Sequence, residues 1–303
     1  MNVYASIDLG SNTVRLLVAK KENDKLETLH SSHQITRLGK GLNTGGNLSA
    51  EAIRDTIGAI KEFKKEAAPY KPEQIWIVAT SAVRRAKNQA AFIKEVFEET
   101  GLKVEVIPWH EEAKMASLGV NYALGIKGEF LLFDIGGGST EFILCEGGEI
   151  KERVGTELGV VTLSETYIKN NPAQENEISN LAAEVGKNIA DVKSKINISQ
   201  GCSLVGTAGT ITTIAAIDMD MFPYDPLRIN GHRIGRDRIE EIKNNLSGLT
   251  LKEIEDMPQI EKGREDLILP GIIIICRVMD IFGFKEMMIS DYGLREGIIL
   301  ANI

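Results

Sequence analysis

Two short stretches of the chain place an aspartate, an apolar residue and a glycine together at the end of an apolar run. One reads IDLGSNTVRLLV (residues 7–18), and the other reads FDIGGGSTEFIL (residues 133–144). Small hydroxyl residues follow the glycines in both, and a second apolar run then begins, so each stretch predicts a β-hairpin. Such a turn can bind phosphate, because glycine permits the positive φ angles that aim successive N–H groups at one anion. A tight turn without a ligand explains one copy equally well, but two related copies favour a shared function.

Two other glycine-rich phosphate loops do not fit the second stretch. A dinucleotide-binding turn opens a helix, whereas residues 141–150 (EFILCEGGEI) have the composition of a strand followed by another turn. A Walker loop needs Gly-Lys-Ser or Gly-Lys-Thr, which occurs nowhere in the chain. The hairpin turn is therefore the remaining interpretation.

Carboxylates beside such a turn need a cation. Asp8 and Asp134 would lie too close to a bound phosphate to remain bare anions, and a divalent cation can bridge the two kinds of oxygen. Hard oxygen ligands favour Mg²⁺, with Mn²⁺ as an alternative. Glu141 lies just past the turn and is a third candidate metal ligand, through water.

A third loop, VGTAGTITTIAAI (residues 205–217), has the pattern of a strand, a glycine turn and a helix. Its amides could bind an anion at the helix N-terminus, although a plain strand-to-helix connection fits equally well. Together the three loops provide these candidate phosphate-binding residues: Ser11, Asn12, Thr13, Gly136, Gly137, Gly138, Ser139, Thr140, Gly209 and Thr210.

The overall composition is that of a globular protein. The chain has 303 residues and a formal net charge of −8, so bulk attraction to DNA or to a membrane surface is not expected. Its three cysteines are scattered and odd in number, which fits a cytoplasmic protein better than a disulfide framework. No signal peptide is visible, and the most apolar run (residues 267–276) predicts a buried helix rather than a membrane span.

Strand and helix patterns alternate and then start again near residue 129. A strand is expected at 75–80, a helix at 110–124 and an amphipathic helix at 177–196. We predict two similar α/β domains, residues 1–124 and 125–303, with a final helix at 293–303 that packs back on the first domain.

Seven segments occur in the order found in one family of phosphohydrolases, and they extend over nearly the whole chain. The chain resembles the exopolyphosphatase/guanosine pentaphosphate phosphohydrolase (Ppx/GppA) family of the actin/sugar-kinase/Hsp70 superfamily. The resemblance implies two duplicated actin-like (ribonuclease H-like) α/β domains with an interdomain cleft. The segments are IDLGSNTVRLLVA, VATSAVRRAKN (78–88), EEAKMASLGV (111–120), FDIGGGSTEF, NGHRI (230–234), LPGIIII (269–275) and SDYGLREGII (290–299).

The resemblance also implies an activity and assigns residues to it. Members hydrolyse a terminal phosphoanhydride of inorganic polyphosphate or of pppGpp with Mg²⁺. By motif position Glu112 resembles the general base, Arg84 a phosphate-gripping arginine, and Asp134 and Glu141 the acids that hold the metal. The residue pattern alone favours an ordinary helix start for Glu111 and Glu112, since acids stabilise a first helical turn.

A departure from the family pattern and several alternatives remain. Pro108, Trp109 and His110 stand where the family usually has a Ser-Gly pair leading into the acidic cluster, so that Trp109 replaces a flexible glycine. A superfamily kinase or ATPase, or a weakly catalytic sensor of guanosine penta- or tetraphosphate, is an alternative to the hydrolase. The sequence distinguishes neither polyphosphate from pppGpp as the substrate nor a monomer from a homodimer as the oligomeric state.

Overall fold

The structure, a computed structural model, describes residues 2–23 and 25–303 and divides into two compact units. Unit 1 comprises Met1–Gly119 and Leu294–Ile303, and unit 2 comprises Val120–Gly293. The chain passes from unit 1 to unit 2 within one helix, and its final segment belongs to unit 1. Each unit has its own sheet and its own apolar core.

Unit 1 contains a five-stranded sheet in the order β3-β2-β1-β4-β5. The first three strands are antiparallel, whereas β4 runs parallel to β1 and β5 runs parallel to β4. The carboxyl ends of β1, β4 and β5 therefore lie at one edge, where α/β proteins usually bind ligands. The strands are β1 (Asn2–Leu9), β2 (Thr13–Glu22), β3 (Lys25–Ile35), β4 (Gln74–Ala79) and β5 (Val104–Val106).

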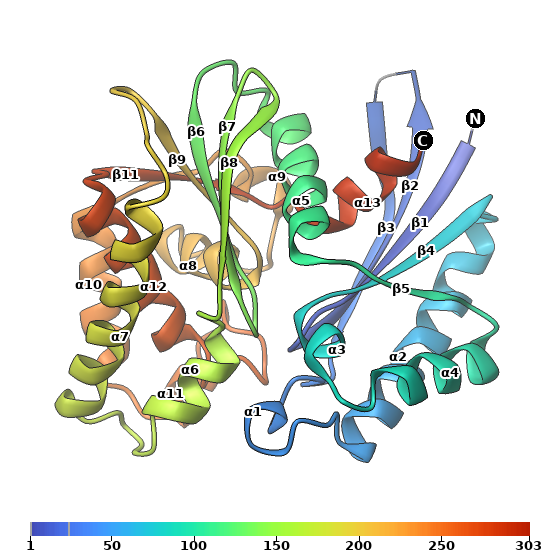
Figure 1. Ribbon diagram of the computed structural model, residues 1–303, viewed down its shortest axis with the longest axis horizontal. Coiled ribbons are helices and arrows are strands. Elements are labelled where there is room, and N and C mark those ends of the chain that lie inside the picture. The colour runs from blue at the N-terminus through green and yellow to red at the C-terminus, as the bar shows by residue number, and fades with distance from the viewer. Residues whose placement is uncertain (1, 24) are drawn as a thin grey trace. The chain divides into compact units, whose positions relative to one another are not determined.

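Helices α2, α4 and α13 pack against the sheet of unit 1 (Figure 1). The helices that lie wholly or partly in this unit are α1 (Leu42–Gly45), α2 (Ala50–Ala67), η1 (Ala68–Tyr70), α3 (Ser81–Arg85), α4 (Gln89–Thr100), α5 (Trp109–Leu124) and α13 (Leu294–Asn302). Apolar residues of α2 and α4 pack with alternate residues of β1 and β2 in one core. Ile298 of α13 packs with Val78 and Ile107 in another, so α13 is an integral part of unit 1.

Helix α13 makes a very close contact with α5. A Cβ atom added to Gly297 would lie 1.7 Å from the backbone oxygen of Met115, so only glycine fits. Met115 lies one turn after Glu112, the predicted base. Packing at Gly297 therefore fixes the helix that carries this acid.

We expect Gly297→Ala to destabilise the protein by about 1–3 kcal/mol or more, because the helix backbones must move apart. Gly58→Ala in α2 is a matched control, because Gly58 is exposed and its added Cβ would meet nothing within 4 Å. The control should gain about 1 kcal/mol from helix propensity. Thermal unfolding of both variants checks the prediction, which is contradicted if Gly297→Ala melts at or above the temperature of the parent.

Unit 2 repeats the sheet of unit 1 and adds one strand. Its order is β10-β11-β9-β6-β7-β8, in which β6, β7 and β8 are antiparallel and β9 and β11 run parallel to β6. Read from β8, this order matches that of β3 to β5, so the predicted duplication is confirmed. The strands are β6 (Phe130–Ile135), β7 (Thr140–Glu146), β8 (Glu149–Thr156), β9 (Ser203–Thr207), β10 (Arg233–Gly235) and β11 (Glu286–Ser290).

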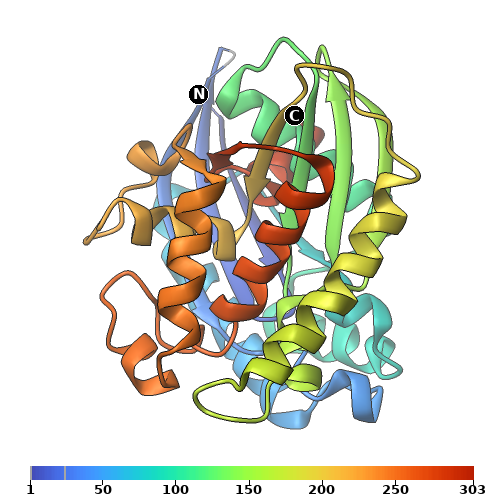
Figure 2. The same cartoon turned by 90° about the vertical axis from the view of Figure 1, so that its left-hand side faces the viewer.

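The helices of unit 2 are α6 (Val160–Tyr167), α7 (Glu175–Lys193), α8 (Gly209–Asp218), α9 (Pro226–Ile229), α10 (Arg236–Ser247), α11 (Leu251–Glu255) and α12 (Ile268–Phe282). The apolar helix α12 lies between α7 and α10 (Figure 2), and nearly all of its residues are buried. This confirms the buried helix expected at residues 267–276. Across the described residues, no helix has the length and apolar character needed to cross a membrane.

Candidate active site

The two glycine turns have the same geometry. The Gly10 N–H donates to the Thr13 carbonyl at 3.2 Å, and the Gly136 N–H donates to the Ser139 carbonyl at 2.9 Å. The flanking strands pair in the same register, since Asp8 lies opposite Arg15 as Asp134 lies opposite Glu141. The two hairpins predicted from the sequence are therefore confirmed.

The reason for glycine at the start of each turn differs from the one predicted. None of the turn glycines Gly10, Gly136, Gly137 and Gly138 has a positive φ, so that explanation is wrong for both turns. An added Cβ would instead lie 2.9 Å from the Thr13 oxygen or 3.1 Å from the Ser139 oxygen. Glycine is needed because the turn folds back closely on itself.

The carbonyl groups of the first turn are held by the segment that follows β3. The Ser11 carbonyl accepts from the Gly39 N–H at 2.7 Å. The Asn12 carbonyl accepts from the N–H groups of Thr36 (3.1 Å) and Arg37 (2.9 Å). These bonds fix the carbonyl side of the turn.

The second turn is held in the same way by the start of α6. The Gly136 carbonyl accepts from Val160 N–H at 3.1 Å, and the Gly137 carbonyl accepts from Val161 N–H at 2.9 Å. Gly159 packs directly on the turn, because an added Cβ would lie 2.2 Å from the carbonyl carbon of Gly138.

The N–H groups of the two turns have no such partners. In the two turns, five backbone amides donate to no acceptor within residues 2–23 and 25–303, although most of these residues are buried: Ser11, Asn12, Gly137, Gly138 and Ser139. Buried backbone donors without an acceptor are rare in folded proteins. Successive unpaired N–H groups in a turn form a concave anion site. Each turn can therefore bind phosphate oxygens.

The side chains beside the two turns differ in charge. Asp134 and Glu141 form a cross-strand pair, and Glu141 is only 3% exposed. Two acids in this arrangement repel each other unless a cation lies nearby. At the equivalent place in unit 1, Asp8 faces Arg15, whose Nη1 lies 3.9 Å from the Asp8 Oδ2 atom.

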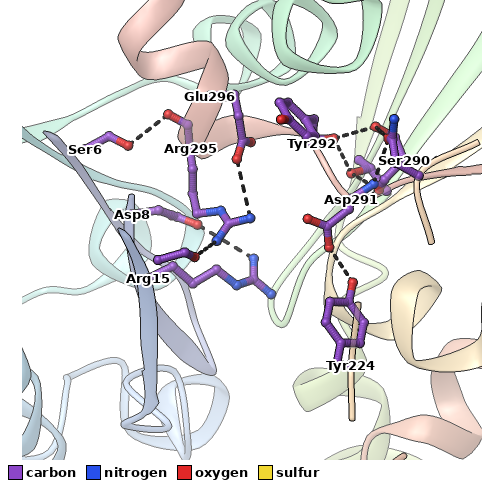
Figure 3. Close-up of polar contacts among 12 residues, drawn as sticks. Ser6, Asp8, Arg15, Tyr224, Ser290, Asp291, Tyr292, Arg295 and Glu296 are labelled. Carbon is purple, nitrogen blue, oxygen red and sulfur yellow. Dashed lines mark hydrogen bonds and ion pairs between the residues drawn. The ribbon is translucent and has the colours of Figure 1, made fainter. Parts of the chain in front are cut away.

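Asp8 belongs to a cluster of charged groups at the end of β1 (Figure 3). Burial raises the pKa of the Asp8 carboxyl above its ordinary value, although the positive charges of Arg15 and Arg295 oppose this, and Glu296 reinforces it. Arg295 pairs with Glu296 at 3.4 Å and donates to the Ser31 hydroxyl at 2.9 Å. The cluster keeps a carboxyl group in a position that is unfavourable for its charged form.

Asp8→Asn should therefore stabilise the metal-free protein at pH 7. Below the unfolded-state pKa of about 3.9 the carboxyl is protonated in both states, and as pH rises toward the higher folded pKa the parent loses stability. We expect a melting temperature at least about 2 °C above that of the parent at pH 7 with EDTA, and a smaller difference as pH falls toward 4. The exposed Asp55→Asn is the control, and equal melting of the Asp8 variant and parent at pH 7 contradicts the prediction.

Glu112 and Arg84 meet at the same edge of unit 1. Arg84 lies in α3, which follows β4, and Glu112 lies in the first turn of α5, which follows β5. Arg84 Nη1 lies 2.9 Å from Glu112 Oε2 and also donates to the Ile107 carbonyl at 2.9 Å. Their side chains are only 24% and 11% exposed. The ion pair holds the Glu112 carboxylate in a defined position.

The third loop begins a helix, as predicted, after a strained residue. Ala208 has φ 79° and ψ 173°, a conformation that is essentially restricted to glycine and often occurs at functional sites. Gly209 is the first residue of α8. Thr210 packs against α12, because an added Cβ on Gly271 would lie 2.1 Å from its methyl group. Phosphate binding here stays a prediction that depends on backbone amides.

Two of the predicted hydroxyl groups have protein partners. The buried Thr140 hydroxyl donates to the Leu158 carbonyl, which ties β7 to the segment behind the second turn. The Thr13 hydroxyl accepts from Asn12 Nδ2 at 3.3 Å. The hydroxyl groups of these two threonines therefore stabilise the turns through hydrogen bonds within the protein.

The buried oxygens at the first turn fit a partly hydrated cation. No cluster of three or more His, Cys, Asp or Glu side chains with metal-binding geometry occurs in the described parts of the chain. In the same residues, Asp8 Oδ1 and Asn12 Oδ1 are buried and accept no hydrogen bond. Mg²⁺ commonly uses one or two carboxylates plus water and substrate phosphates, so this donor set suits it.

The family of the chain follows from its match to known sequences. The model of the Ppx/GppA phosphatase family matches residues 17–303. The chain belongs to the Ppx/GppA phosphatase family. Its predicted assignment to this family is confirmed.

Several relatives resemble the chain along most of its length. It is 34% identical to the bifunctional 3-dehydroquinate synthase/phosphatase of Fusobacterium nucleatum, over 99% of this chain and 46% of that protein. It is 29% identical to exopolyphosphatase 2 of Mycobacterium tuberculosis (98% and 97%). It is 27% identical to the guanosine-5'-triphosphate,3'-diphosphate pyrophosphatase of Aliivibrio fischeri (99% and 59%). The chain thus spans about half the length of two of these relatives.

A solved structure agrees with the family assignment. The crystal structure of the Aquifex aeolicus Ppx/GppA family member superposes with a TM-score of 0.84 at 36% identity, over 99% of this chain and 97% of that one. With the two sheets of matching order, this confirms the actin-like two-domain fold expected from the sequence.

Sequence patterns do not reveal the residues that fix Asp8 and the two glycine turns of this Ppx/GppA protein in place. Arg15 was not recognised as the partner of Asp8, although the hairpin register places these two residues opposite each other. The segments 36–39 and 159–161 are not revealed either, because they bind the carbonyl groups of turns that are distant from them in the chain.

Proposed function

We propose that the chain is a phosphohydrolase that releases the terminal phosphate of inorganic polyphosphate or the 5′-γ-phosphate of pppGpp. The observation that carries the proposal is the set of unpaired amides in two turns of the same geometry. The names of the Mycobacterium and Aliivibrio relatives, an exopolyphosphatase and a guanosine-5'-triphosphate,3'-diphosphate pyrophosphatase, support these two substrates.

The residues of the chain have separate roles in this proposal. The turn amides bind phosphate oxygens and orient the phosphate chain. Arg84 offers a planar pair of N–H donors to phosphate oxygens. Glu112, positioned by Arg84, accepts the proton of the attacking water.

Mg²⁺ is part of the proposal. Asp134, Glu141 and Asp8 are the residues that would hold it, because they supply carboxylate oxygens beside the turns. A bound Mg²⁺ would neutralise negative charge on the phosphate oxygens. Mn²⁺ has similar ligand preferences and could replace it.

Phosphate release from polyphosphate, pppGpp and ATP, measured with Mg²⁺ and with EDTA, tests the proposal. We expect release from polyphosphate or pppGpp without any acceptor, and loss of release with EDTA. Release that requires an acceptor molecule would favour a kinase instead. Tight binding of pppGpp with no release would contradict hydrolysis.

A further inference from the structure

A short segment of unit 2 exposes two aromatic rings. Phe222 and Tyr224 are 72% and 46% exposed, and they lie between α8 and α9. The segment is anchored at both ends, because Met221 and Ile229 are only 4% and 0% exposed. Exposed aromatic side chains on an anchored segment are typical of a binding surface.

Tyr224 is connected to the edge of the sheet that carries the second phosphate turn. Its hydroxyl donates to the carboxylate of Asp291, the residue that follows β11 (Figure 3). The carbonyls of Ser290 and Tyr292, on either side of Asp291, accept from the Thr207 hydroxyl at 3.1 and 3.0 Å. Thr207 ends β9 and is the strand partner of Asp134. Tyr224 and Asp134 therefore belong to the same carboxyl edge.

The groups beside this edge are complementary to a nucleobase. Aromatic rings stack on the faces of bases, and each stacked base contributes substantially to affinity. A carboxylate has about four lone-pair positions, so Asp291, which accepts from Tyr224, belongs to a group type that can accept from several donors at once. Guanine presents such donors at its ring N–H and its 2-amino group. Inorganic polyphosphate has neither a ring nor these donors.

We propose that Phe222, Tyr224 and Asp291 bind the guanine base of a nucleotide whose phosphates bind at the glycine turn of unit 2. This inference rests on the proposed function and makes pppGpp, rather than inorganic polyphosphate, the preferred substrate. The aromatic segment provides base recognition, and the turn provides phosphate recognition.

Kinetics with two substrates test this assignment. We expect Tyr224→Ala and Phe222→Ala each to lower the ratio of kcat/KM for pppGpp to kcat/KM for inorganic tripolyphosphate by about 5- to 150-fold. Tyr224→Phe, which keeps the ring, should lower the ratio less. Leu227→Ala is the matched control, because Leu227 is an exposed apolar residue of the same segment (81%) and should leave the ratio unchanged.

Binding supplies a readout that does not need turnover. The affinity of guanosine tetraphosphate, measured by calorimetry, should fall about 5- to 150-fold in Tyr224→Ala and remain the same in Leu227→Ala. Asp291→Asn should weaken it about tenfold or more, since the charged acceptor is lost. If the wild-type protein hydrolyses neither substrate, the proposed function fails, and these affinities still decide the base site.

Three results would overturn the inference. One is an unchanged substrate ratio and unchanged affinity in both aromatic variants. Another is an equal loss in Leu227→Ala. The third is conversion of an oligomer to a monomer by Tyr224→Ala in sedimentation, without a change in the ratio, because the rings would then lie between two copies of the chain. Should Tyr224→Ala fail to fold, Phe222→Ala and Asp291→Asn carry the test.

Discussion

Glu112→Gln is expected to lower kcat by about 10²- to 10⁴-fold, the usual contribution of a general base. Glutamine has nearly the same shape as glutamate and can still accept a hydrogen bond from Arg84, which lies 2.9 Å away in the parent. It cannot take a proton from water. The loss should therefore appear in kcat, and substrate affinity should change little.

Steady-state kinetics with pppGpp and polyphosphate, together with calorimetric binding, check this result. Glu111→Gln is the matched control, because it makes the same chemical change at the neighbouring residue of the same helical turn. We expect the control to keep its kcat within a few-fold of the parent. Normal turnover by Glu112→Gln would show that another group activates the water.

The second large effect is expected from Gly159→Ala. The new methyl group would lie 2.2 Å from the Gly138 carbonyl carbon and 2.4 Å from the Gly137 oxygen, so the turn must move. The move breaks the alignment of the turn amides, and displacement by about 1 Å can cost 10²-fold in activity. We expect kcat/KM to fall about 10²-fold and stability to fall by about 1–3 kcal/mol.

Gly128→Ala is the control for this substitution. Gly128 is an exposed residue of the same unit whose added Cβ would meet nothing within 4 Å. Its kinetics and its melting temperature should match those of the parent. If Gly159→Ala keeps full kcat/KM, the second turn is not part of the active site.

The sequence predicted the local elements of this fold well. Each hairpin follows from an apolar run, a glycine and a second apolar run, and the helix at 110–124 corresponds to α5 (Trp109–Leu124). The helix caps are local in the same way, since the Ser49 hydroxyl accepts from the Ala52 N–H at 3.1 Å and Thr250 forms a capping box with Glu253. Such features depend on residues that are close together in the chain, and a sequence pattern contains information about such residues.

The parts that the sequence did not predict depend on contacts between distant segments. Nothing near Gly138 in the chain indicates that Gly159 touches it, or that Gly297 touches Met115. The role of Gly136 was mistaken because a positive φ and a close approach both require glycine. Only the packed structure distinguishes these two reasons.

The place of α13 has a consequence for how the chain folds during synthesis. Unit 2 is continuous in the chain, whereas unit 1 needs Leu294–Ile303, which the ribosome adds after the whole of unit 2. Until then Val78 and Ile107 lack Ile298, the helix residue that packs on them, and part of their apolar surface stays uncovered. Domains generally fold in order from the N-terminus. In this chain we expect unit 2 to complete its fold before unit 1 does. Unit 1 is therefore the part that chaperones must protect longest.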